Sequence, residues 1–125
     1  MNPELFVYVK LPDPIGPIDR GKKYEDPIAE RLAEESLGEL SGGGSQLGDE
    51  QPDGTRPIEF CGIDVEVTDR RKALVALRVT LIELHAPIGT ELHYTVAGVR
   101  LQDELQAHGW VLERPRSFVH PAFGC

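Results

Sequence analysis

Residues 57–86 have the sequence PIEFCGIDVEVTDRRKALVALRVTLIELHA, and this stretch decides the fold. Its first part, residues 57–68, is rich in β-branched residues and alternates in the manner of a β-strand. Its second part, residues 69–86, begins at Asp69, a residue type that caps helices, and repeats leucine at helical spacing. A strand followed by an amphipathic helix predicts that the helix packs on one face of a sheet.

The rest of the chain repeats this alternation. We expect strands over residues 4–11, 38–44 and 90–97, and a helix over residues 26–37 that begins at Asp26-Pro27. The resulting order β-α-β-β-α-β predicts an α+β fold, a ferredoxin-like split β-α-β sandwich. Its antiparallel sheet would carry two helices on one face. A chain of 125 residues fits a single domain of this kind.

The second helix carries two apolar stripes. The first is expected to face the sheet and consists of Leu74, Leu77, Leu81 and Leu84. The second lies roughly 100° away around the helix and consists of Val75, Val79 and Ile82. Its neighbour is the first helix, the proline-rich connector before that helix, or another subunit. A two-fold homodimer would bury this stripe.

The strand over residues 57–68 changes its alternation between Phe60 and Ile63. A β-bulge at Cys61-Gly62 would bring both apolar sets onto the core side. Without a bulge, Asp64 and Glu66 lie on the same face as Phe60.

Six residues are candidates for a ligand-binding site on the sheet face opposite the helices. They are Phe6, Tyr8, Asp64, Glu66, Glu91 and His93. The two carboxylates on one strand, with Glu91 and His93 on another, could form a carboxylate–imidazole cluster suited to acid–base work. The alternative is a solvated sheet face. The two aromatic residues would form a patch that is covered by the C-terminal tail or by a partner subunit.

Three other sequence features give less support for a binding or catalytic site. The glycines of residues 42–44 could present backbone N–H groups to an anion, but they lack the GxxxxGK[ST] and GxGxxG patterns, so a strand end that needs backbone freedom is the alternative. Cys61 is expected to be buried and inert. The four histidines lack metal-ligand spacing, and we assign no catalytic residue, metal or cofactor.

The C-terminal region allows two interpretations. Leu101, Leu105 and His108 recur at helical spacing, whereas Ala97-Gly98 could instead turn a hairpin. Residues 110–125 contain Trp110, Phe118 and Phe123, which is too aromatic for a disordered tail. We expect this tail to dock on the domain or on a partner subunit.

The formal net charge of −8 argues against a nucleic-acid-binding surface, which needs clustered lysine and arginine. No apolar run reaches the roughly 18 residues that a membrane span needs, and no signal peptide is recognisable. With two cysteines and no CxxC motif, a cytoplasmic protein with reduced thiols is expected.

Three segments carry a resemblance to a known group of proteins: GGSQLG at residues 43–48, IEFCGIDV at residues 58–65 and APIGTEL at residues 86–92. The chain resembles small uncharacterised bacterial proteins of ferredoxin-like build. The resemblance supports the expected architecture and brings no catalytic residues.

Two functions remain open. The first is a non-enzymatic binding module that pairs with a protein partner or with itself, such as an immunity- or inhibitor-type protein that neutralises a basic toxin or nuclease. The second is a small enzyme or ligand-binding domain that uses Asp64, Glu66, Glu91 and His93 on the open sheet face. An enclosed pocket around those groups would favour the second function.

Overall fold

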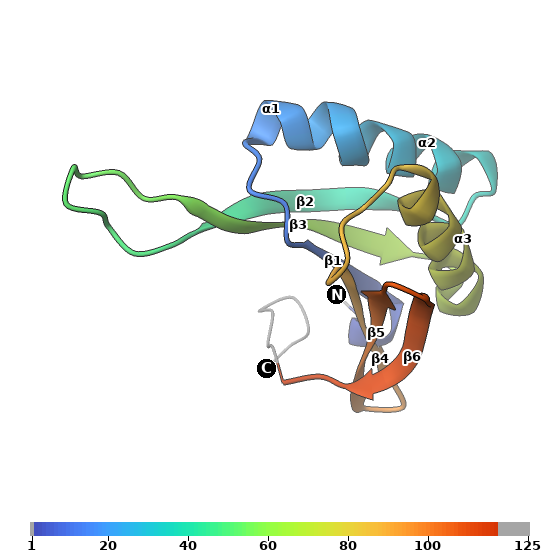
Figure 1. The fold of residues 1–125 in the computed structure, drawn as a ribbon. Helices are drawn as coiled ribbons and strands as arrows, with labels where there is room; N and C mark the ends of the chain where they lie inside the picture. The colour runs from blue at the N-terminus through green and yellow to red at the C-terminus, as the bar shows by residue number, and fades with distance from the viewer. Residues whose placement is uncertain (1, 118–125) are drawn as a thin grey trace.

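The computed structural model describes residues 2–117, without the side chains of residues 45 and 46. It contains one antiparallel sheet of six strands in the order β2-β3-β1-β4-β5-β6 (Figure 1). The strands are β1 (Phe6–Leu11), β2 (Gly38–Leu47), β3 (Ile58–Val67), β4 (Glu91–Val96), β5 (Val99–Gln106) and β6 (Gly109–Pro115). The expected α+β class and antiparallel sheet are confirmed, with two more strands than the four expected.

The first helical segment begins nine residues earlier than expected, at Pro17 instead of Asp26. After the short η1 (Pro3–Leu5), the chain forms α1 (Pro17–Arg20), the π-helical η2 (Gly21–Glu25) and α2 (Asp26–Glu34) in one continuous run. Pro27 lacks an N–H and its ring collides with the carbonyl four residues before it. The wide π turn directly before Pro27, in which the Asp26 N–H bonds Gly21, accommodates this proline inside the helix. The helix start expected at Asp26-Pro27 was therefore wrong.

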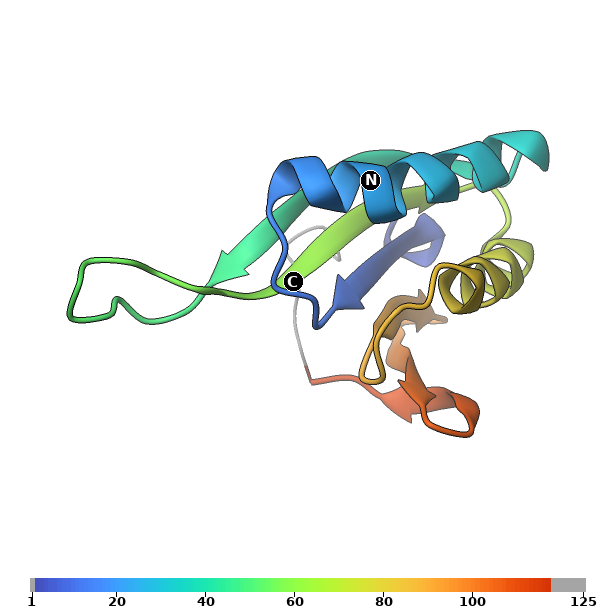
Figure 2. The ribbon, with the colours of Figure 1, turned by 45° about the horizontal axis from the view of Figure 1, so that its top comes forward.

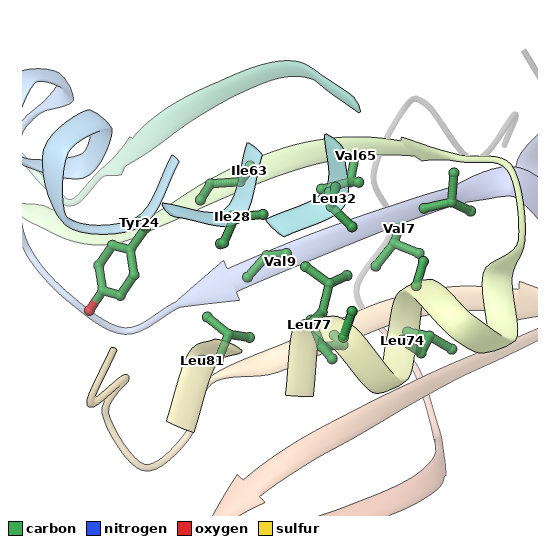
Figure 3. Close-up of a cluster of buried hydrophobic side chains, with 14 of the residues drawn as sticks. Val7, Val9, Tyr24, Ile28, Leu32, Ile63, Val65, Leu74, Leu77 and Leu81 are labelled. Carbon is green, nitrogen blue, oxygen red and sulfur yellow. The ribbon is translucent and has the colours of Figure 1, made fainter. Parts of the chain in front are cut away.

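The second helix, α3 (Arg70–Glu83), begins as expected. The Asp69 carboxylate accepts a hydrogen bond of 3.0 Å from the Lys72 N–H, which satisfies one of the orphan donors of the first turn. Both helical segments contribute to one core on one face of the sheet (Figure 3). Its central side chains are Val7, Val9, Tyr24, Ile28, Leu32, Ile63, Val65, Leu74, Leu77 and Leu81. Leu84 is half-buried beside this core, as the leucine stripe predicts.

The bulge expected at Cys61-Gly62 is absent. Both residues pair in regular register with β1 on one side and with β2 on the other. The register shifts lie elsewhere in the β2–β3 pair, between Leu40 and Gly42 and between Gln46 and Leu47. The core face of β3 therefore begins at Cys61, and Gly62 belongs to the opposite face.

The hairpin interpretation of the C-terminal region is confirmed and the helix at 101–108 was wrong. Ala97 and Gly98 both have positive φ, at 50° and 80°, and join β4 to β5. The first part of the expected tail is β6, which pairs with β5. The Trp110 indole Nε1–H donates to the Arg78 carbonyl of α3 at 3.2 Å. Docking of Phe118 and Phe123 concerns residues outside the described part.

One segment extends away from the rest of the molecule. The β2–β3 hairpin continues beyond the sheet, and its connecting loop, residues 48–57, projects from the body in both views (Figures 1 and 2). The loop carries Asp49, Glu50 and Asp53, all exposed. The protein thus presents an acidic arm. Within residues 2–117, no helix combines the length and apolar character that crossing a membrane requires.

Candidate functional site

The structure brings all six candidate residues onto the sheet face opposite the helices. In β1, Tyr8 lies opposite Asp64 of β3 and opposite His93 of β4. Phe6 lies opposite Glu66. Glu91 shares the face of His93 because the two residues are separated by one position in β4. The period-two alternation of three strands is sufficient to place this cluster.

The polar centre of this face is formed by Tyr8, Glu91 and His93. A hydrogen bond of 2.8 Å joins His93 Nε2 to Glu91 Oε1, and the Tyr8 and His93 ring centroids lie 5.7 Å apart. Burial raises the pKa of Tyr8 to about 12, assisted by the charge of Asp64. The hydrogen bond from His93 lowers the pKa of Glu91. A neutral imidazole held by a carboxylate is a possible general base.

The arrangement is nevertheless closed. His93 and Phe6 are 0% exposed, and Tyr8 is also buried. A general base must lie within hydrogen-bond reach of the proton that it removes, so these groups cannot meet a substrate in this conformation. Among the described residues, no group of three histidine, cysteine or acidic side chains could hold a metal ion. The sequence placed the cluster correctly but could not show that it is buried.

Glycines allow the side chains of this face to lie flat. A Cβ atom at Gly62 would collide with the Tyr8 ring, so the ring lies directly over this glycine. A Cβ atom at Gly42 would lie 3.0 Å from Asp64 Oδ2. A carboxylate over the glycine segment opposes the binding of an anion there. Residues 42–44 lie inside β2, beside the register shift between Leu40 and Gly42. They are therefore strand residues, as in the alternative given for them, but they lie within the strand and not at its end.

Burial also gives His93 a pH-dependent effect on stability. Desolvation lowers the pKa of His93, the bond to Glu91 acts against this, and the charges of Arg116 and Lys10 lower the pKa further. The unfolded chain, with the ordinary value of 6.5, therefore binds the proton more readily than the folded chain. The stability contributed by neutral His93 is complete above pH 6.5 and is lost as the pH falls through the lower folded pKa.

We expect the urea concentration at the unfolding midpoint of the wild type to decrease when the pH is lowered from 7.5 to 5.5. His93→Phe should make this decrease smaller. Phenylalanine keeps a ring beside Tyr8 but cannot take up a proton. His108→Phe, at an exposed histidine in the β5–β6 turn, is the control and should keep the wild-type slope. Equal slopes for His93→Phe and the wild type would contradict the effect.

A buried charge cluster, which the sequence analysis missed, joins α3 to the C-terminal strands. Asp103 of β5 is fully buried and its Oδ2 lies 2.8 Å and 2.7 Å from Arg78 Nε and Nη2. Its Oδ1 accepts hydrogen bonds from the Tyr94 hydroxyl at 2.6 Å and from the Glu113 N–H at 3.1 Å. The last contact lies at a register shift between β5 and β6, where Glu113 has a φ of 57°. Four contacts from three residues fix this carboxylate, so its role is to hold the fold.

Cys61 is also accounted for by packing. Its side chain is buried in the core on the helix-facing side of β3, and burial raises the pKa of its thiol to about 11. A thiol with so high a pKa is a poor nucleophile at neutral pH. The expectation that Cys61 is buried is confirmed.

The outer face of α3 presents an exposed apolar row, which we call the α3 row: Val75, Val79 and Ile82. These side chains are 52%, 46% and 51% exposed, so neither the first helical segment nor the rest of the described chain covers them. The sequence predicted this second stripe, and the structure leaves it half-exposed, because α2 lies beside Val75 and Val79 without covering them.

A groove of about 610 Å³ lies beside the α3 row, between α2 and α3. Its lining residues are Arg31, Glu35, Leu37, Arg71, Lys72, Val75, Ala76 and Val79. Arg31 forms an ion pair of 3.1 Å with Glu83 across the two helices. The groove therefore combines an apolar floor with a predominantly basic rim, in a chain whose net charge is negative.

Searches of protein-family models, of curated proteins and of solved structures each found no match for this chain. A functional conclusion therefore rests on the geometry of the two faces described above.

Proposed function

We propose that this chain is a small acidic protein-binding module whose binding surface is the α3 row with the adjoining groove. The observation that carries the proposal is that Val75, Val79 and Ile82, which follow one another along one face of α3, are each about half exposed. Scattered apolar residues are ordinary on a protein surface, whereas a contiguous apolar patch with a polar rim is typical of an interaction site. Such a surface binds a partner without catalysing a reaction. This agrees with the burial of Phe6, Tyr8 and His93 on the sheet face.

A photocrosslinking amino acid at position 79 tests this surface in cells. We expect adducts with a protein when the crosslinker replaces Val79 and none when it replaces Val99. Val99 is the matched control because it is a valine of similar exposure, 56%, in the β4–β5 hairpin. The mass of the adduct identifies the partner. Equal crosslinking at both positions, or none at either, would contradict the proposed surface.

An immunity- or inhibitor-type role is the specific version that the overall charge supports. A net charge of −8 favours encounter with a basic partner, and the projecting arm with Asp49, Glu50 and Asp53 offers an acidic contact for it. The basic rim of the α3 groove does not suit such a partner. A basic partner would therefore use the arm and leave the α3 row for another contact.

The second candidate function is a small enzyme or ligand-binding domain. The Tyr8–His93–Glu91 arrangement supports it, because an imidazole held by a carboxylate can transfer protons. It would require the buried groups to become accessible. Reproducible turnover of a substrate that is lost on Asp64→Asn or His93→Ala would replace the binding module with this function.

We also propose the ferredoxin-like assignment for part of the chain. Strands β1 to β4 and the two helical segments follow the order of a split β-α-β unit, with β3 and β4 on either side of β1. In this assignment, β5 and β6 are an added hairpin that extends the sheet beyond β4.

A further inference from the structure

The α3 row has the spacing of a helix-pairing seam. Within α3, Lys72, Val75, Val79 and Ile82 are separated by three, four and three residues. This alternation is the heptad pattern by which two helices pack side by side. Lys72 lies at the N-terminal end of the apolar part and is exposed, and the helix ends at Glu83, directly after Ile82.

We propose that the occupant of the α3 row is the α3 helix of a second copy, packed antiparallel across a two-fold axis. This inference rests on the proposed function and names its partner. An axis near Val79 packs this valine against its own equivalent and Val75 against Ile82 of the second copy. Such an interface is isologous, so the same patch is used on both molecules.

The charges around the row fit this orientation. Lys72 lies at the N-terminal end of the row and is exposed. Glu83 lies at the C-terminal end and is also exposed, and it pairs with Arg31 of its own chain. On a helical projection of about 100° per residue, these two side chains flank the same side of the row. Rotation about a two-fold axis perpendicular to the two helices keeps both side chains on the same side of the interface and exchanges the N-terminal and C-terminal ends of the row. Each Lys72 therefore meets Glu83 of the other copy. Parallel pairing would instead leave each Lys72 at the level of the other Lys72, with Glu83 of the second copy at the far end of the row.

The helix dipole favours the same orientation. Three cationic residues, Arg70, Arg71 and Lys72, occupy the first turn of α3, where a positive charge opposes the dipole. Arg70 bonds the carbonyl oxygens of Glu4 and Thr95. Within the described chain, Arg71 and Lys72 have no acidic partner. An antiparallel neighbour brings the negative end of its dipole beside both.

The interface is small, because each helix contributes three half-exposed apolar side chains and the rim of one groove. Interfaces of this size belong to weak or transient complexes. We therefore expect a dimer that forms at roughly tens to hundreds of micromolar, an affinity range typical of such complexes.

A charge-exchange experiment tests the pairing. Sedimentation equilibrium should show dimer formation by the wild type and dimerisation weakened roughly tenfold for Lys72→Glu and for Glu83→Lys, because the two-fold axis makes each change twice. The double variant Lys72→Glu/Glu83→Lys should recover most of the wild-type affinity. Glu50→Lys, which reverses an exposed charge on the arm, is the control and should leave dimerisation unchanged.

Two results would overturn the inference. One is a double variant that is no better than the singles, and the other is a wild type that remains monomeric at millimolar concentration. The photocrosslinking at Val79 then separates the two proposals. An adduct with a different protein rejects self-pairing and keeps the binding module, whereas no protein adduct at all rejects both. Circular dichroism verifies that each variant is folded before it is compared.

Discussion

Asp103→Ala is expected to lower the free energy of unfolding by about 3–5 kcal/mol, because it leaves the charge of Arg78 without its buried partner. It also removes the acceptor of the Tyr94 hydroxyl and of the Glu113 N–H. The whole stability of a domain is typically about 5–15 kcal/mol, so this single loss is large. A urea titration followed by circular dichroism measures it.

Two further variants identify the cause of this loss. Asp53→Ala, at an exposed aspartate of the arm, should change stability by less than about 0.5 kcal/mol. Arg78→Met/Asp103→Leu, which removes both charges, should lose less than Asp103→Leu alone, because no buried charge is left uncompensated. If the double change costs as much as the sum of its two single changes, the ion pair does not hold the C-terminal hairpin to α3.

Leu77→Ala is expected to cost about 2–5 kcal/mol, because it empties volume in the middle of the core. Leu77 is 1% exposed and belongs to the cluster that contains Val7, Val9, Ile63 and Val65. The same strands carry the sheet face on their other side, so this packing also fixes the positions of Tyr8 and Asp64. A denaturation series measures the loss.

Leu112→Ala is the matched control for the core variant, since it removes the same atoms from a side chain that is 48% exposed on the edge strand β6. It should cost less than about 1 kcal/mol. Similar losses for the two leucines would place α3 away from the sheet and contradict the helix-on-sheet core.

Sequence patterns alone were sufficient to predict those features that depend on a single strand or helix. The alternation around Val7 and Val9 identified the core face of β1, and Asp69 marked the start of α3. The spacing of Val75, Val79 and Ile82 identified a second apolar stripe on that helix, and the structure shows that this stripe is half-exposed. In each case, the periodicity of one segment alone determines which side chains are buried.

The remaining features depend on contacts between distant segments. Pro27 indicated a helix start, and only the π turn before it explains how the helix begins at Pro17. Asp103 lies in a stretch with helical spacing, and its role is defined by Arg78 of α3 and by the strand pairing around it. Sequence alone cannot show that His93 is buried, because burial depends on what covers the sheet face.

The central claim is that α3, rather than the opposite sheet face, is the surface through which two copies of this chain bind each other. NMR spectra of the uniformly ¹⁵N-labelled protein, recorded on dilution from about 1 mM to 20 µM, test it most directly over the range of weak association expected here. We expect concentration-dependent amide shifts to cluster at the α3 row and at Arg31, Arg71 and Lys72 of the groove. Shifts confined to Tyr8, Asp64 and His93, or no shifts anywhere, would contradict the account.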